Sequence, residues 1–236
     1  MTITLYQFEI SPYADKVRRA LRYKDLAFEV VEVLVSKRNA HKAVSPTGKF
    51  PALVHDGRTI VDSSDILRYL DRTFPKPQLA PDSPRDAALA TILEDWADES
   101  LYFYDLTMRP WPQNRAWFVS DLLAHEKGLA RAVLAKAIPG AIAKVAAAQG
   151  LGRKRPDVVV SDLTALYDAL DGWLDGETWL AGPRLSSADI AVRVMVNVLD
   201  RTVEGARLRA ERVRLDQWCR RVDEAAPPEG LSITKR

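Results

Sequence analysis

The stretch SPYADKVR, residues 11–18, comes directly after a short run of strand-forming residues and has the features of a helix start. Ser11 is a good N-cap, and Pro12 suits the first helical position because its φ is already helical and no N–H is needed there. Behind it, Val17, Ala20 and Leu21 recur at helical spacing. The pattern predicts a strand over residues 5–8 and then a helix. We expect the solvent side of this helix to carry its basic residues: Lys16, Arg18, Arg19 and Arg22.

Two more stretches extend this unit. Residues 48–53 (GKFPAL) lead into a predicted hairpin of two strands, 52–55 and 59–61, with Asp56-Gly57 as the turn. Residues 61–66 (VDSSDI) begin a helix that runs to about residue 74, with Ser63 or Ser64 as its N-cap. Residues 28–35 read as a further strand, and residues 36–43 as a weak helix or an irregular segment. The helical crossover predicts parallel pairing of the first two strands, and the tight turn predicts an antiparallel hairpin. The result is a mixed sheet with helices packed on it.

Residues 75–84 contain four prolines in ten residues, which is typical of a linker. Beyond it we find helical periodicity and no convincing strand pairs. The predicted helices cover residues 85–105, 116–137, 142–149, 158–174, 187–199 and 208–222. Ser186 and Asp189 have the spacing of an N-capping box, a structural role. We therefore expect an α/β domain over residues 1–76 followed by an all-α helical bundle over residues 84–236.

Composition narrows the class of protein. The net charge of +2 is too small to favour a nucleic-acid or membrane partner, and residues 152–155 (GRKR) read as an exposed loop. With a single cysteine, Cys219, no disulfide can form within the chain; its helical setting predicts a small core residue. His41, His55 and His125 are far apart in the sequence, so we expect no metal site. These features favour the cytoplasm.

Together, the three stretches in this order, followed by a proline-rich linker and a helical half, resemble the glutathione S-transferase family. The resemblance covers the first 75 residues in motif detail and the rest in outline. It implies a thioredoxin-like N-terminal domain with a cis peptide bond before Pro51, glutathione as co-substrate, an electrophilic second substrate, detoxification as the role, and a homodimer. In the helical half, residues 96–111 also resemble the metaxin-like and Fax-like branch, whose members are less securely enzymes.

The resemblance implies roles that the chemistry of glutathione makes reasonable. The thiol must lose its proton to become a nucleophile, and Ser11 at a helix N-terminus can donate a hydrogen bond to the thiolate; it can also serve only as the N-cap. Backbone groups of Phe50, before Pro51, would bind the cysteinyl part like an added strand. The remaining implied contacts are Lys49 to the glycyl carboxylate, Ser63 to the γ-glutamyl carboxylate and Asp62 to its ammonium group.

The chain departs from the family pattern in two ways. No cysteine lies in residues 11–14, which argues against thiol–disulfide chemistry on the protein. Phe8 stands where tyrosine-type members place a Tyr, so Tyr13 and then Tyr6 are the alternatives to Ser11. The second substrate, an apolar electrophile, is expected beside Tyr13, Tyr102, Met108, Arg109 and Trp111. A non-catalytic ligand-binding or scaffold protein, or a peroxidase, isomerase or ether-cleaving enzyme of the same fold, remains open.

Overall fold

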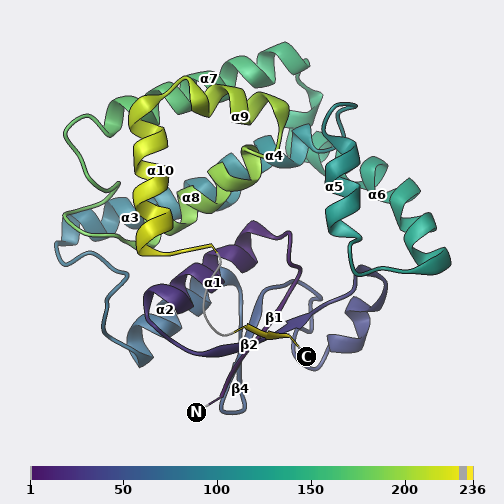
Figure 1. Ribbon diagram of the computed structural model, residues 1–236, viewed down its shortest axis with the longest axis horizontal. Coiled ribbons are helices and arrows are strands. Elements are labelled where there is room, and N and C mark those ends of the chain that lie inside the picture. The colour runs from purple at the N-terminus through teal and green to yellow at the C-terminus, as the bar shows by residue number, and fades with distance from the viewer. Residues whose placement is uncertain (1, 229–232, 236) are drawn as a thin grey trace.

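The computed structural model describes residues 2–228 and 233–235, and its first half follows the predicted order of elements (Figure 1). These elements are β1 (Ile3–Gln7), α1 (Pro12–Tyr23), β2 (Phe28–Glu32), the 3-10 helix η1 (Val35–His41), β3 (Ala52–His55), β4 (Arg58–Val61) and α2 (Ser63–Thr73). α1 begins at the predicted proline, and the turn residue Gly57 has a φ of 84°, which glycine adopts without steric cost.

The strands form one sheet in the order β4-β3-β1-β2-β5. β1 pairs in parallel with β2 and antiparallel with β3, and β3 and β4 form the hairpin, so the predicted pairings are confirmed. The prediction that the second half is wholly helical is wrong. A short strand, β5 (Ile233–Lys235), pairs in parallel with β2 at the sheet edge. Three residues are too few to produce a recognisable period-two pattern in the sequence.

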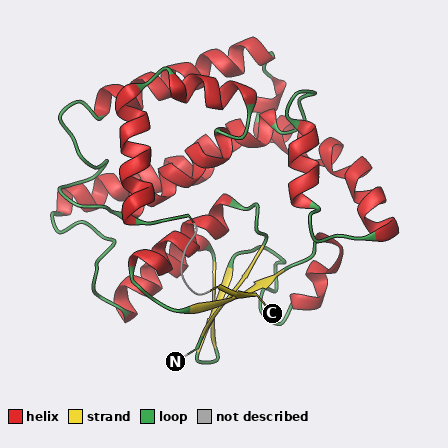
Figure 2. Cartoon of the chain, viewed as in Figure 1, coloured by secondary structure: helices red, strands yellow, loops and turns green. Residues whose placement is uncertain are grey.

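The helical half surrounds a central, almost fully buried helix, α8, and Figure 2 shows how helices dominate this part of the molecule. Its elements are α3 (Pro84–Trp96), the π-helix η2 (Ala97–Leu101), α4 (Tyr102–Met108), α5 (Arg115–Leu122), α6 (Gly128–Gln149), the 3-10 turn η3 (Leu151–Arg153), α7 (Pro156–Trp173), α8 (Ser187–Leu199), α9 (Val203–Ala210) and α10 (Val213–Ala225).

Four predicted helices differ from those observed. The helix predicted over residues 85–105 contains the π-turn η2, and the one over residues 116–137 is interrupted before Gly128, where φ is 58°. The predicted helix 142–149 is the second half of α6, and the one over residues 208–222 is two helices that meet near Arg212. Hydrophobic periodicity continues across these breaks because a short turn shifts the apolar face only slightly.

The hydrophobic core is continuous between the two halves. One buried cluster includes Val17 and Leu21 of α1 together with Ile190 and Val194 of α8, and these two helices pack against each other. The linker is also fixed: the Asp71 carboxylate accepts hydrogen bonds from the backbone N–H groups of residues 79 and 80, both at 2.8 Å. Helices α1 and α2 of the first half therefore lie between the sheet and the helical bundle (Figure 1).

The predicted capping box at the start of α8 is present and buried. The Asp189 carboxylate accepts from the backbone N–H and the hydroxyl of Ser186, at 2.9 and 2.8 Å, and also from Leu180 N (2.8 Å) and Trp218 Nε1 (3.0 Å). Burial raises the pKa of Asp189, and these donors offset part of that effect. Asp189 thus joins α8, α10 and the segment before α8. Cys219 is buried in the same helical half, as predicted.

Candidate functional site

Ser11 lies between the end of β1 and the first turn of α1. Its backbone N–H donates to Phe8 O at 3.0 Å, and its Oγ accepts a long hydrogen bond of 3.4 Å from Ala14 N, so its expected N-cap role is confirmed. The side chain is half-buried, and we find no acceptor for its hydroxyl proton among the described residues. Ser11 can therefore donate a hydrogen bond to an external anion at the positive end of α1.

At the end of the β1–β3 ladder, the backbone N–H and C=O of Phe50 have no hydrogen-bond partner among the described residues. Asp56 N donates to Thr2 O at 3.2 Å, and hydrogen-bonded pairs recur every second residue in an antiparallel ladder, so the register places Phe8 opposite Phe50 as the next such pair. Within the described chain, no backbone hydrogen bond joins them. The bond between Phe50 and Pro51 is cis, as expected. The N–H and C=O of Phe50 are available to an extended ligand.

Asp62, and not Ser63 or Ser64 as predicted, is the N-cap of α2. Its Oδ1 accepts from Ser64 N at 2.9 Å and from Asp65 N at 3.3 Å. Its backbone has φ 75° and ψ 130°, a conformation that is rare for a residue with a side chain and that clusters at ligand sites. Ser63 is buried, and the described residues supply no hydrogen-bond partner for its hydroxyl. The N-terminus of α2 therefore offers donors to an anion.

The sheet register brings these three segments to one end of the sheet. Tyr6 pairs with Ala52, and Ala52 pairs with Val61. Ser11 follows the end of β1, Pro51 precedes the start of β3, and Asp62 follows the end of β4, so antiparallel pairing places all three at the same end. Lys49, two residues before Pro51, is exposed. Two helix N-termini and a free strand edge thus meet in one place.

A buried polar cluster lies behind this site and joins it to the helical half. Lys16 Nζ is 2.7 Å from Glu94 Oε1 and from Asp98 Oδ2, and it donates to Ser64 Oγ at 2.9 Å. Burial raises the pKa of both carboxyl groups; Lys16 reverses this for Glu94, whose pKa is lowered, but not for Asp98, whose pKa is raised. Ser64 Oγ also donates to Asp98 at 3.2 Å. The lysine fixes α1, the start of α2 and the η2 turn together.

The expected outward orientation of the basic residues of α1 is wrong for two of them. Lys16 and Arg19 are fully buried. Arg19 donates to Asp15 (3.0 Å), Asp223 (2.7 Å) and the carbonyl oxygen of Ala226 (2.8 Å). Apart from Asp15, the carboxylates that pair with Lys16 and Arg19 are 78 to 204 residues away in the sequence, which is why local periodicity could not reveal this burial.

The hydroxyl of Tyr13, the first alternative to Ser11, already donates a hydrogen bond within the protein. Its hydroxyl donates to the carbonyl oxygen of Asp98 at 2.7 Å, and its ring lies 5.0 Å from that of Tyr102. Burial, with smaller contributions from nearby acidic groups, strongly raises the pKa of Tyr13, so the phenol stays protonated. Tyr6 belongs to a separate cluster with Phe8 and Phe50, on the sheet face away from α1. Of the hydroxyl groups of Ser11, Tyr13 and Tyr6, that of Ser11 is thus the best placed to donate a hydrogen bond to an external anion.

The residues expected to bind a second substrate are only partly brought together. Tyr102 contacts both Tyr13 and Arg109, whose guanidinium lies 5.8 Å from the Tyr102 ring and pairs with the buried Asp105. Burial raises the pKa of Asp105, and Arg109 offsets part of that effect. Met108 is fully buried in the core, and Trp111 packs against the core with part of its surface accessible. Tyr13, Tyr102 and Arg109 form the contiguous part of the expected set.

The loop between α5 and α6 reaches back to the first half beside Ser11. His125 Nε2 lies 2.8 Å from Glu9 Oε2, and the Glu126 carboxylate accepts from Ser36 N (2.9 Å) and Ser36 Oγ (2.8 Å). Glu9 is two residues before Ser11, and Ser36 is in η1. The sequence pattern contained no sign of these contacts, which explain why the predicted single helix is interrupted here.

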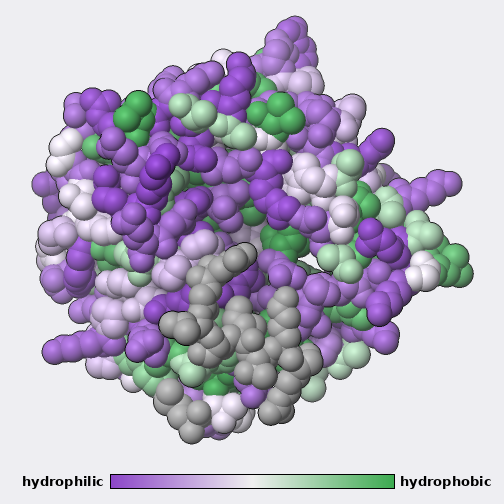
Figure 3. All heavy atoms as spheres, viewed as in Figure 1, coloured by the Kyte–Doolittle hydropathy of each residue, from purple (hydrophilic) through white to green (hydrophobic). Residues whose placement is uncertain are grey.

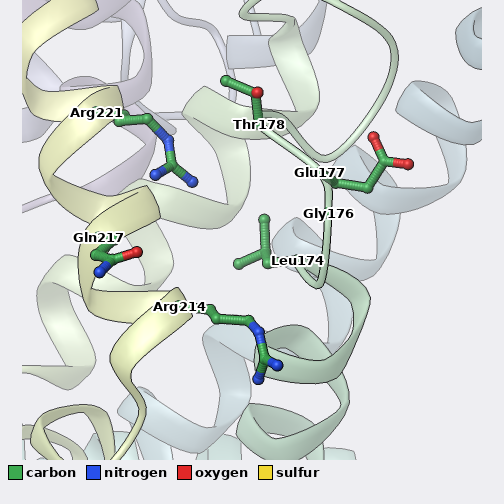
Figure 4. A pocket seen from close by; sticks show the side chains of 7 residues that line it. All are labelled: Leu174, Gly176, Glu177, Thr178, Arg214, Gln217 and Arg221. Carbon is green, nitrogen blue, oxygen red and sulfur yellow. The ribbon is translucent and has the colours of Figure 1, made fainter.

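A surface pocket lies elsewhere, between α10 and the segment after α7 (Figure 4). It has a volume of about 310 Å³ and is lined by Leu174, Gly176, Glu177, Thr178, Arg214, Gln217 and Arg221. Arg214 is already paired with Asp171 and Asp175, each at 3.2 Å. None of the predicted site residues lines this pocket, so we keep it separate from the site at the sheet end.

The residues that sequence reasoning missed are Lys16, Glu94 and Asp98. The one available signal was that Lys16 precedes Ala20 by one helical turn and so shares its buried side. In residues 2–228 and 233–235 there is no group of three or more His, Cys, Asp or Glu side chains that could hold a metal ion. A search of the same residues finds no helix both long and apolar enough to span a membrane.

Comparison with known proteins decides the family. The family model for the glutathione S-transferase N-terminal domain matches residues 5–78, and the model for the C-terminal domain of the same family matches residues 141–225. The two models occur in the order that the fold requires, and together they cover more than half of the chain. The chain belongs to the glutathione S-transferase family. The resemblance carried by the three N-terminal stretches is confirmed.

Several curated relatives share parts of this chain. A probable glutathione S-transferase of Nicotiana tabacum is 32% identical over 107 residues, 42% of this chain and 45% of that protein. Protein LigF of Sphingobium sp. is 36% identical over 105 residues, 42% and 41% of the two chains. The isoprene-epoxide–glutathione S-transferase of Rhodococcus sp. is 27% identical over 188 residues, 78% of each. The first two alignments thus span less than half the length of those relatives.

Solved structures show the same fold over nearly the whole chain. The crystal structure of the beta-etherase LigF from Sphingobium sp. superposes with a TM-score of 0.70 at 24% identity, covering 94% of this chain and 95% of that one. A glutathione S-transferase from Rhodospirillum rubrum superposes with a TM-score of 0.67 at 24% identity, covering 99% and 94%. The glutathione S-transferase fold predicted from the sequence is confirmed.

Proposed function

We propose that this protein is a glutathione S-transferase whose glutathione site lies where β1, β3 and β4 meet α1 and α2. The observation that carries the proposal is the sheet register, which gathers Ser11, Phe50 and Asp62 at one end of the sheet. Each offers what one part of glutathione needs: a hydroxyl at a helix N-terminus, an unpaired peptide edge and an acidic N-cap. Membership of the family supports the same assignment.

The donors and acceptors divide among the parts of glutathione in a consistent way. The γ-glutamyl carboxylate binds at the N-terminus of α2 and the hydroxyl of Ser63, and its ammonium group binds the carboxylate of Asp62. The cysteinyl peptide pairs with the backbone of Phe50, beside Pro51. Exposed Lys49 meets the glycyl carboxylate. Ser11 donates to the thiolate, which is further stabilised by the positive end of α1, and the thiol pKa falls.

The thiolate then attacks an apolar electrophile held between the two halves. Tyr13 of α1 and Tyr102 and Arg109 of the helical half line the proposed position of the electrophile, and Met108 and partly buried Trp111 pack beside them. The catalysis consists of positioning the reactants and lowering the thiol pKa, with no covalent enzyme intermediate. The division into a glutathione domain (1–76) and a helical domain (84–236), a homodimeric assembly, a cytoplasmic location and a role in detoxification belong to the same proposal.

A second candidate is the cleavage of an ether, favoured by the similarity over 105 residues to protein LigF, whose crystal structure is described as that of a beta-etherase. The same thiolate would attack the carbon that carries the ether oxygen. A C–S bond forms, the C–O bond breaks, and the oxygen leaves with the electron pair and takes up a proton. This chemistry uses the same glutathione site and differs only in the leaving group, so product analysis on ether and halide substrates separates the two reactions.

The test combines retention on immobilised glutathione with conjugation of 1-chloro-2,4-dinitrobenzene. We expect the protein to be retained, and Ser11→Ala to lower kcat about 10²- to 10³-fold, as for the loss of one donor to a developing anion, with little loss of retention. The matched control is Ser83→Ala, because Ser83 Oγ caps α3 by accepting a hydrogen bond of 3.0 Å from Asp86 N, outside the site.

Three outcomes would contradict the proposal or part of it. If the protein is not retained and does not bind free glutathione in a calorimetric titration, the transferase assignment is wrong and a scaffold role takes its place. If glutathione binds but Ser11→Ala and Ser83→Ala conjugate equally fast, the site is right and the role of Ser11 is wrong. Retention without turnover of any halide, epoxide or ether would leave a glutathione-binding protein without transferase activity.

A further inference from the structure

The chain around α6 has a charge composition unlike the rest of the molecule. Residues 127–156 contain seven basic residues and no acidic residue, whereas the remainder of the chain has 27 basic and 32 acidic residues. The low net charge of +2 therefore conceals a strongly basic segment within an acidic molecule. Such asymmetry points to an electrostatic partner of opposite sign.

One side of α6 faces solvent along its whole length. Its inner side is formed by Leu134, Ile138, Ile142 and Ala146, four residues apart, which are partly or fully buried. The outer side carries Leu129, Val133, Lys136, Gly140 and Lys144 at spacings of four, three, four and four, which keeps them within one narrow stripe of a helix. We call these five residues the α6 stripe.

The stripe combines exposed apolar and basic groups. Leu129 is 81% exposed and Val133 is 57% exposed, and Figure 3 shows hydrophobic surface next to hydrophilic surface at the right-hand edge, where Figure 1 places α6. Among the described residues, Lys127, Lys136 and Lys144 have no carboxylate within ion-pair distance. By contrast, Lys154 and Arg155, just beyond the helix, pair with acidic residues of α7. The positive charge of the stripe is therefore uncompensated.

We propose that the α6 stripe docks on an anionic phospholipid surface. Apolar side chains flanked by lysines on an exposed helix are what an interfacial helix needs: Leu129 and Val133 enter the headgroup region while Lys136 and Lys144 meet lipid phosphates. A second copy bound stripe to stripe would bring like charges together, and a nucleic acid would leave Leu129 and Val133 exposed. Since α6 is not a membrane-spanning helix, the contact is peripheral and reversible.

The proposed membrane contact of α6 lies close to the candidate site. The loop that precedes the helix holds Ser36 through Glu126 and lies beside Glu9, two residues before Ser11. A membrane bound to α6 would therefore lie near the loop whose residues Glu126 and His125 contact the first half beside the candidate site. Apolar electrophiles concentrate in membranes, so docking there would bring the protein to them.

The test is co-sedimentation with vesicles of phosphatidylcholine alone and of phosphatidylcholine with phosphatidylglycerol at a 7:3 ratio. We expect binding to the anionic vesicles only, and its loss in 0.5 M salt. A basic residue near an anionic surface changes partitioning about fivefold, so Lys136→Ala with Lys144→Ala should weaken binding by at least tenfold. Leu129→Ser with Val133→Ser should weaken the binding at low salt, because two apolar side chains no longer enter the headgroup region.

The controls are matched in exposure. Lys76→Ala with Arg85→Ala removes two exposed cations, and Val203→Ser with Val213→Ser removes two apolar groups that are 61% and 67% exposed, all outside α6. These pairs should bind like the wild type. Equal binding to both vesicle types, no binding at low salt, or α6 variants that bind like the controls would overturn the proposal. So would a change from dimer to monomer, by light scattering, in the Leu129–Val133 variant, because a second copy would then cover the stripe.

Discussion

Helices α1 and α6 both carry several basic residues, but the structure treats these residues in opposite ways. In α1, Lys16 and Arg19 are fully buried and paired with carboxylates from the helical half. In α6, Lys136 and Lys144 are exposed, and no carboxylate of the described chain approaches them. The first set of charges holds the molecule together beside the candidate site. Lys136 and Lys144 remain available to an anionic partner outside the molecule.

The difference arises from partners that are distant in the sequence. Glu94 and Asp98 lie about 80 residues after Lys16, and they reach it because α1, α3 and η2 all pack against α8. α6 packs instead on α4, α5 and η3, and its inner side is apolar. Whether a lysine is structural or free therefore depends on which element the fold places opposite it.

The largest effect in this comparison should come from Lys16→Met. The substitution leaves Glu94 and Asp98 buried without their cation, and breaking a buried pair in this way costs about 3–5 kcal/mol of unfolding free energy. Urea denaturation measures it, with Lys136→Met on α6 as the matched substitution, for which we expect less than about 0.5 kcal/mol. If Lys16→Met does not fold, Lys16→Arg, which keeps the charge, should fold. Equal losses for the two Met variants would remove the distinction between the helices.

An intermediate effect is expected at Asp200, the C-cap of α8. Burial raises its pKa to about 6 from an ordinary value of 3.8, although Arg209, at 2.8 Å, and Arg193 offset part of this. The folded protein thus holds the proton more tightly than the unfolded chain. The stability that this proton contributes is complete below about pH 4 and is lost as the pH rises through 6, by about 2–3 kcal/mol at 1.36 kcal/mol per pKa unit.

Asp200→Asn removes this titration, so its unfolding free energy relative to the wild type should rise by about 2–3 kcal/mol between pH 4 and pH 7. Urea unfolding at several pH values measures the difference. The matched control is Asp65→Asn, because Asp65 is an exposed carboxylate in the first turn of α2. A constant difference between wild type and Asp200→Asn across this range would show that burial does not govern Asp200.

The smallest effect on stability is expected for the α6 stripe itself. Leu129→Ser with Val133→Ser should change the unfolding free energy by less than about 0.5 kcal/mol per site, because exposed side chains lose little on substitution. Thermal unfolding monitored by circular dichroism checks this. A loss of several kcal/mol would mean that these residues are buried in the protein as it exists in solution, and the contrast with α1 would have to be redrawn.

The sequence predicted most of the fold because its signals there are local. Ser11-Pro12 marks a helix start, Asp56-Gly57 marks a hairpin, and Ser186 with Asp189 marks a cap, and each of these depends on neighbours within a few residues. The predicted order of elements in the first half and the strand pairings were confirmed. β5 was missed because three residues carry too little pattern, and the breaks before Gly128 and near Arg212 were missed because apolar periodicity continues across them.

The candidate site was predictable to a smaller extent. The segments that contain Ser11, Pro51 and Asp62 could be placed from their motifs, and their meeting at one sheet end follows from the register. The burial of Lys16 and its two carboxylates could not be predicted, since it depends on how the helical half docks. The same holds for Tyr13, whose hydroxyl is taken up by the carbonyl of Asp98. The roles of the site residues in binding glutathione remain predictions.

The most direct test of the central claim is the pKa of the glutathione thiol bound to the protein. Ultraviolet difference spectroscopy of the thiolate across pH measures it in the wild type and in Ser11→Ala. A free thiol titrates near 8.5, and a helix N-terminus with a hydroxyl donor should lower this by about one unit or more. We predict that Ser11→Ala returns most of that shift while still binding glutathione. A bound thiol with the same pKa in both proteins, or one that titrates like free glutathione, would contradict the account.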